Sequence, residues 1–151
     1  MAAQAIRISI LCGVCLIPVQ GQNLVPNPSF EVFTMCPPSN LGNGGLMECE
    51  PWNSVSGTTD YFHACSDPMY RGVPYNFQGY QPAHMGAAYS GQYTWAFSAG
   101  AEFMMAPLLD TLEADHCYKV SAWINLANEG CGADQYGILL TPDPPTVFVG
   151  H

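Results

Sequence analysis

The chain has 151 residues, enough for one domain, and 48% of them are hydrophobic while only 10% are charged. Three basic residues stand against twelve acidic ones, which gives a formal net charge of −9 at pH 7. Such a surface repels phosphate backbones, so nucleic acid is not expected as a partner. The 15 glycines, the 13 prolines and the 12% aromatic content favour a turn-rich β-domain over a disordered acidic tail.

Residues 1–21 are typical of a secretory signal peptide. Arg7 precedes an apolar run at 8–19, and the small Gly21 predicts cleavage before Gln22. A transmembrane anchor would need about 20 apolar residues, and a proline and a glutamine interrupt this run too early. A lipoprotein leader is the alternative, although the second leader cysteine follows valine rather than a small residue. The expected location is extracellular, periplasmic or outer-membrane-associated.

Cleavage would leave a mature domain at 22–151, with Arg71 and Lys119 against twelve acidic residues, a net charge of −10. Five cysteines would remain, Cys36, Cys49, Cys65, Cys117 and Cys131. An oxidising compartment favours disulfides, and the lack of a CxxC spacing gives a zinc site little support. By position alone, Cys36 can pair with Cys49 in the same loop. Cys117 and Cys131 would close one hairpin, and an odd count leaves one thiol over.

The mature chain opens with Asn-Leu-Val-Pro-Asn-Pro-Ser-Phe-Glu at 23–31. Residues 24–25 can begin an edge strand, which two prolines then interrupt. Asn27 precedes Pro28 and is therefore expected to be extended. Phe30 is the next large apolar anchor, so this stretch predicts a strand, a kink and a return to the core.

A long loop at 35–51 follows, rich in proline, glycine and asparagine, and loops of this length are usually functional or held by a disulfide. A segment at 52–63 begins with tryptophan, and 66–86 is again irregular. A strand then begins, with aromatic residues at period 2 on one face, Tyr89, Tyr93, Trp95 and Phe97. Further strands are predicted at 102–109, 118–126 and 135–141. In the last two, the apolar residues of the predicted buried faces are Tyr118, Val120, Ala122, Ile124 and Leu126, then Tyr136, Ile138 and Leu140.

Three motifs carry a family resemblance: the opening at 23–31, Val-Pro-x-Asn-Phe-x-Gly-Tyr-Gln at 73–81, and Gly-x-Ala-Tyr-x-Gly at 86–91. They resemble the galactose-binding-like, carbohydrate-binding-module-like N-terminal domains of bacterial surface proteins that precede OmpA-like or gliding-motility-type C-terminal modules. A further segment after Trp52, Gly-Thr-Thr-Asp-Tyr-Phe at 57–62, departs from the family's Gly-Thr-Pro-Asp-Tyr-Phe at Thr59. The resemblance implies an all-β jelly-roll β-sandwich. Such a fold needs about eight strands, so we expect a domain truncated at its C-terminal end, with further domains missing downstream.

The resemblance also implies two structural features. The first is a disulfide between Cys36 and Cys65. The second is a structural calcium near Glu31, since calcium prefers carboxylate and carbonyl oxygens, with its late acidic partner beyond the end of this chain. A solvent-facing glutamate on a strand explains Glu31 equally well.

No motif identifies a reaction, so no enzymatic activity is expected. His63, beside Cys65, superficially suggests a nucleophile pair, but a disulfide cysteine next to a loop histidine explains it better. A polar turn between strands accounts for the acidic cluster of Asp110, Glu113 and Asp115.

Flat exposed aromatic rings with polar neighbours are the usual means of binding sugars. Four candidates lie beside turns or polar positions, Trp52, Tyr75, Tyr80 and Trp123. Most aromatic rings in a sandwich belong to its core, which is the competing explanation for each. The sequence thus predicts a non-catalytic secreted module that binds glycans or cell-envelope material. The alternatives are a structural spacer ahead of an OmpA-like anchoring domain and an accessory domain of a secreted hydrolase.

Overall fold

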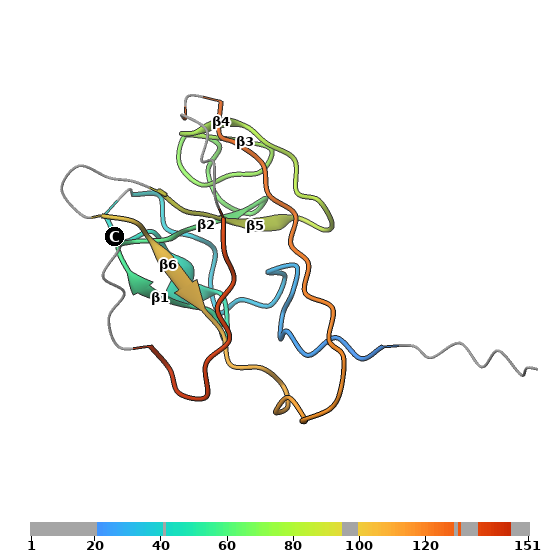
Figure 1. Ribbon diagram of the computed structural model, residues 1–151. Coiled ribbons are helices and arrows are strands. Elements are labelled where there is room, and N and C mark those ends of the chain that lie inside the picture. The colour runs from blue at the N-terminus through green and yellow to red at the C-terminus, as the bar shows by residue number, and fades with distance from the viewer. Residues whose placement is uncertain (1–20, 41, 95–99, 129, 131–135, 146–151) are drawn as a thin grey trace, which may run out of the picture.

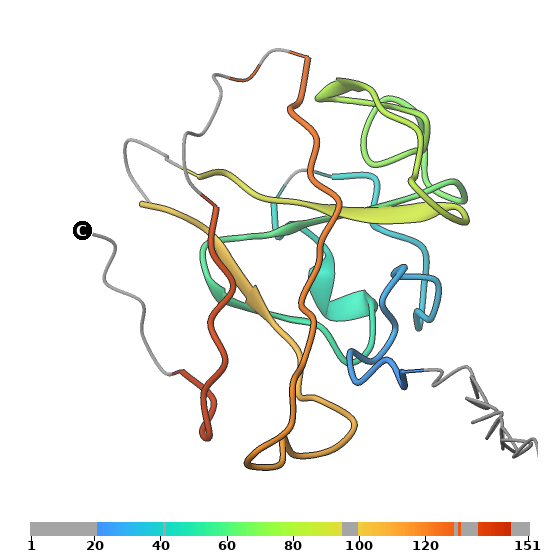
Figure 2. The same cartoon turned by 45° about the vertical axis from the view of Figure 1, so that its right-hand side comes forward.

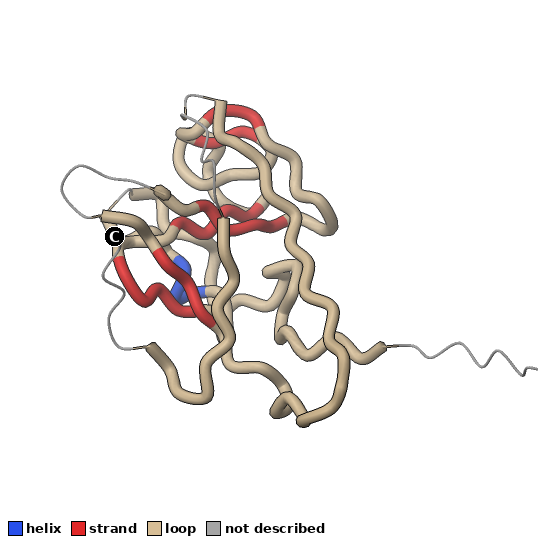
Figure 3. The backbone as a smooth tube through the Cα atoms, in the orientation of Figure 1, coloured by secondary structure: helices blue, strands red, loops and turns tan. Residues whose placement is uncertain are grey.

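The computed structural model describes residues 21–40, 42–94, 100–128, 130 and 136–145, so the predicted leader lies almost wholly outside it. The described chain is all-β, as predicted. It also contains one 3-10 turn. Its strands form three antiparallel pairs: β1 (Asn53–Ser56) with β6 (Phe103–Met105), β2 (Asp60–His63) with β5 (Ala88–Gly91), and β3 (Tyr75–Asn76) with β4 (Gly79–Tyr80). Loops connect these short strands (Figure 3). No helix among the described residues has the length and apolar character needed to cross a membrane.

The β2–β5 pair lies between the β3–β4 hairpin and the β1–β6 pair (Figures 1 and 2). Successive side chains of a strand point to opposite faces, so β2 separates two apolar groups. Tyr61 belongs to the main core, with Leu46 of η1 (Leu46–Glu48), Cys49 and Ala88, and the partly buried residues packed on it are Phe30, Phe33, Trp52 and Met104. Phe62 lies on the opposite side, where its ring stacks on Tyr89 at 4.9 Å and Phe77 at 5.8 Å between centroids.

The opening motif is held on this core by hydrogen bonds rather than by a strand. The Asn27 side chain donates to the carbonyls of Val32 and Glu50 at 2.8 and 2.7 Å. Tyr61 donates its hydroxyl proton to the Phe30 carbonyl at 2.9 Å. The expected edge strand at 24–25 is not formed, and Asn27 is not extended, because its φ is 42°. Asparagine tolerates this left-handed geometry because its amide can bond to nearby backbone.

The strand predictions near the C-terminal end are largely wrong. Of the strand predicted at 102–109, only β6 forms. Residues 118–126 and 136–140 belong to no strand and are exposed throughout. They run along the outside of the molecule, orange and red in Figures 1 and 2. An alternating apolar pattern produces a strand only where a neighbouring strand completes the ladder, and the described part of the chain supplies none here. Residue 135, Trp95 and Phe97 lie outside the described residues.

A disulfide joins Cys36 to Cys65, with 5.9 Å between their Cα atoms, as the resemblance implies. The alternative pairing of Cys36 with Cys49 is therefore wrong, and Cys49 is a buried free thiol. Burial raises the pKa of Cys49 to about 11, which keeps the thiol protonated and unreactive. The structure does not show the predicted bridge from Cys117 to Cys131, because Cys117 is an exposed free thiol and Cys131 lies outside the described residues.

Candidate functional site

Two exposed tyrosines face each other at the open end of the β3–β4 hairpin, away from its turn. Tyr75 and Tyr80 are register partners, 61% and 49% exposed, and their rings meet edge to face at 4.8 Å between centroids. The turn between them is local in origin, because the Asn76 side chain accepts a hydrogen bond from the Gln78 amide at 2.9 Å. The same side chain donates to the Tyr89 hydroxyl at 2.6 Å, which anchors the hairpin on β5.

A distant segment, 123–128, lies against this hairpin (Figure 2). Asn128 accepts a hydrogen bond from the Tyr80 backbone amide at 3.2 Å, and Asn125 donates its side-chain amide to Gln81. The close approach requires Gly79, whose φ is 117° and where a Cβ atom would lie 2.7 Å from the Asn128 side chain. The two segments therefore run side by side in opposite directions.

The Trp123 ring is a further exposed aromatic group, on the segment that lies against the hairpin. It is 81% exposed, and its centroid lies 4.0 Å from that of His84. We call the four residues Tyr75, Tyr80, His84 and Trp123, together with the amide side chains of Gln81, Asn125 and Asn128, the aromatic surface. Apart from His84, the segments 75–84 and 123–128 contain no acidic or basic residue. This surface therefore offers flat rings and neutral hydrogen-bonding groups.

Three of the four predicted sugar contacts, Tyr75, Tyr80 and Trp123, thus belong to one surface. Trp52 does not. Its ring is half-buried against Phe30 at 5.0 Å between centroids, and its indole N–H donates to the Asn27 carbonyl at 3.0 Å. The ring supports the opening motif, so we leave it out of the candidate site.

Glu31 has a structural use of its own. One carboxylate oxygen accepts hydrogen bonds from the backbone amides of Ala87 and Ala88, at 2.8 and 3.1 Å. The side chain therefore ties the opening motif to the start of β5. No cluster of three or more ligating side chains occurs in the described part of the chain, and a calcium ion at Glu31 stays a prediction.

The interpretation of Cys65 as a disulfide cysteine beside His63 is confirmed, because Cys65 is bonded to Cys36 and its backbone amide donates to His63 Nδ1 at 3.0 Å. In the acidic cluster, Asp110, Glu113 and Asp115 are all exposed in the loop after β6. The expected turn between two strands is not formed, because no strand follows at 118–126.

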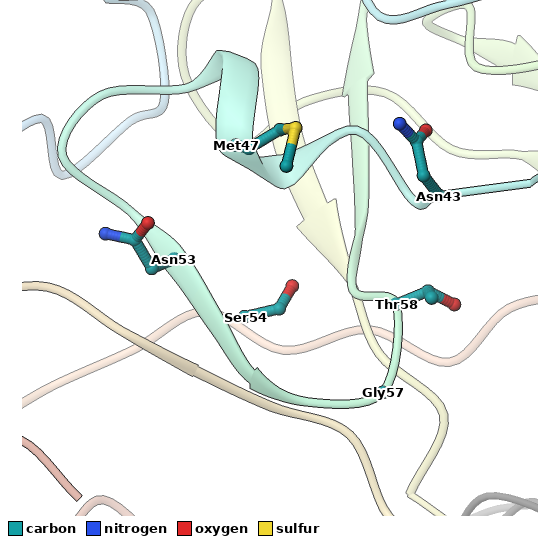
Figure 4. A pocket seen from close by; sticks show the side chains of 6 residues that line it. All are labelled: Asn43, Met47, Asn53, Ser54, Gly57 and Thr58. Atoms are coloured by element: carbon teal, nitrogen blue, oxygen red, sulfur yellow. The ribbon is translucent and has the colours of Figure 1, made fainter. Parts of the chain in front are cut away.

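A separate hollow of about 290 Å³ lies between η1 and the β1–β2 turn, lined by Asn43, Met47, Asn53, Ser54, Gly57 and Thr58 (Figure 4). Two of its polar side chains already serve the fold: Asn53 donates to the Pro51 carbonyl at 2.9 Å, and the Thr58 hydroxyl donates to Glu102 at 3.3 Å. It contains none of the predicted site residues and no aromatic ring. The aromatic surface is therefore the stronger candidate.

Sequence reasoning missed His84, Gln81, Asn125 and Asn128. Asn125 contacts Gln81 across 44 positions of the sequence, and Asn128 contacts Tyr80 across 48. No local pattern indicates contacts between residues so far apart. Comparison with protein families, with curated proteins and with solved structures finds no match for this chain. Any function of this chain is therefore inferred from the site itself.

Proposed function

We propose that this chain is a non-catalytic, secreted module of galactose-binding-like jelly-roll type that binds glycans of the cell envelope through the aromatic surface. The observation that carries the proposal is the exposed Tyr75–Tyr80 ring pair, with the exposed Trp123 on the segment bonded to the same hairpin. Isolated exposed apolar residues are common on proteins and need no explanation. Several flat rings held together by backbone and amide contacts are a different case.

The chemistry of the surface suits a sugar. Aromatic faces stack on the apolar C–H face of a pyranose ring, and a few placed polar groups fix its orientation. Here the amide side chains of Gln81, Asn125 and Asn128 lie among the rings. Amides both donate and accept hydrogen bonds, which matches the hydroxyl groups of a sugar.

Two observations support the remaining parts of the proposal. The Cys36–Cys65 disulfide fits an oxidising compartment outside the cytosol. The antiparallel strand pairs fit a jelly roll, and the alternating residues at 118–126 have the pattern of a strand whose partner is not among the described residues.

The test is a glycan array probed with the exported protein and two variants. Tyr80→Ala should weaken the signal, whereas Tyr118→Ala, which removes a 43% exposed tyrosine outside the aromatic surface, should keep it. Circular dichroism of each variant checks that the fold persists. Absence of binding to every glycan by the folded wild-type protein would favour the spacer function and reject the proposal.

A further inference from the structure

We infer, on the basis of the proposed function, that the aromatic surface binds a linear, neutral oligosaccharide across two stacking positions rather than one terminal sugar. The first position is the Tyr75–Tyr80 ring pair. The second is Trp123, whose ring is oriented by His84.

The two positions lie at opposite ends of segment 123–128. Its Asn128 end is bound at Tyr80, and its Trp123 end contacts His84. Consecutive units of a linear sugar chain that follows this segment can contact both positions.

The groups between the two positions are suited to a continuous chain of sugars. Gln81 and Asn125 bond to each other across the gap between the two segments. This contact places amide groups between the aromatic positions, where the hydroxyl groups of a bridging sugar unit would lie. A ligand confined to one aromatic position would not use them.

The charge of the surface indicates a neutral ligand. Binding a carboxylate or sulfate normally requires Arg or Lys, and neither occurs in the segments 75–84 and 123–128. Arg71, one of the two basic residues of the mature chain, is 1% exposed and paired with Asp60. The acidic residue Glu129 follows segment 123–128 in the sequence, and the mature net charge of −10 also repels anions.

The experiment measures the affinity of the exported protein for neutral β-1,4-linked glucose and galactose oligosaccharides of one to six units, and for oligogalacturonates of the same lengths. Calorimetry gives the affinity, and the part of the tryptophan fluorescence change that is lost in Trp123→Ala reports on the second position. Affinity for the neutral series should rise with length until both positions are covered, and the acidic series should bind more weakly.

Three variants assign the positions. Tyr80→Ala and Trp123→Ala should each weaken binding of the hexasaccharide about three- to tenfold, the range expected for a lost aromatic contact. A single sugar unit should respond to only one of the two changes, and Tyr80→Phe should retain the stacking. Glycan binding that does not change with length, or a hexasaccharide indifferent to Trp123→Ala, would overturn this inference while leaving the proposed function intact. Failure to bind any glycan, on the array or here, would reject both.

Discussion

The Arg71 guanidinium donates a hydrogen bond from Nε to Oδ1 of Asp60 at 2.8 Å, in a site where the arginine side chain is only 1% exposed. The same guanidinium donates to the backbone carbonyls of Pro38 and Asn40. Arg71, one of the few basic residues of this acidic chain, thus links the loop after Cys36 to β2. A buried charge needs such a set of partners, because burial without them is costly.

This pair predicts an unusual response to acid. Burial raises the pKa of Asp60 from an ordinary value of 3.8 to about 6, against the hydrogen bond and charge of Arg71, which lower it. At pH 5, Asp60 is therefore mostly protonated in the folded protein and mostly ionised in the unfolded chain. The contribution of Asp60 to the free energy of unfolding is therefore greatest below pH 4 and is lost as the pH rises through 6.

Urea unfolding at pH 7 and pH 4.5 checks this, with Asp60→Asn as the control that cannot titrate. From pH 7 to 4.5 the wild type should gain about 2 kcal/mol of stability relative to the variant. A loss of stability relative to the variant on acidification would mean that the ion pair outweighs burial.

The buried Thr59 hydroxyl lowers the stability of the fold. The side chain is 0% exposed, and its Oγ1 has no hydrogen-bond partner among the described residues. Thr59→Val removes the hydroxyl at nearly constant shape and should raise the free energy of unfolding by about 1 kcal/mol. Thr59→Ser, which keeps the hydroxyl and loses the methyl group, should not. A destabilised valine variant would show that the hydroxyl is satisfied in solution.

Glu31 should matter for stability. Glu31→Ala removes the acceptor of two backbone amides at the start of β5 and should cost about 2–3 kcal/mol in chemical denaturation. Glu31→Gln keeps one neutral acceptor and should lose less. Equal losses in both variants would indicate that the charge, rather than the hydrogen bonds, is what matters. A calcium titration of the melting temperature adds a test of the predicted ion, since only the wild type should respond to it.

The disulfide should contribute about 3–4 kcal/mol, the chain-entropy value for a separation of 29 residues. The double variant Cys36→Ser, Cys65→Ser should therefore have a free energy of unfolding lower by that amount, and its unfolding midpoint in urea should fall accordingly. It should still fold, because two other contacts also hold this loop. Arg71 donates to the Pro38 carbonyl, and the Ser66 hydroxyl donates to the Pro37 carbonyl. Dithiothreitol serves as the control, since it should destabilise the wild type and leave the variant unchanged.

Local patterns in the sequence determined the features that depend on near neighbours. Turn-forming residues and alternating apolar side chains indicated an all-β chain. The stretch 66–86 was predicted to be irregular, yet it contains the β3–β4 hairpin, whose turn is held locally by the Asn76 side chain. The Cys36–Cys65 bridge came from the family resemblance and is present in the structure.

Tertiary structure alone decided which residues became core and which became surface. Trp52 and Trp123 are both tryptophans beside polar residues, yet the first packs on Phe30 and the second is 81% exposed. The difference lies in what each ring contacts: the opening motif covers Trp52, whereas Trp123 contacts the His84 ring and stays largely open to solvent. The strand predicted at 118–126 failed for a related reason. Burial and ladder pairing are properties of two segments at once, and a single segment's sequence specifies only its own half of the contact.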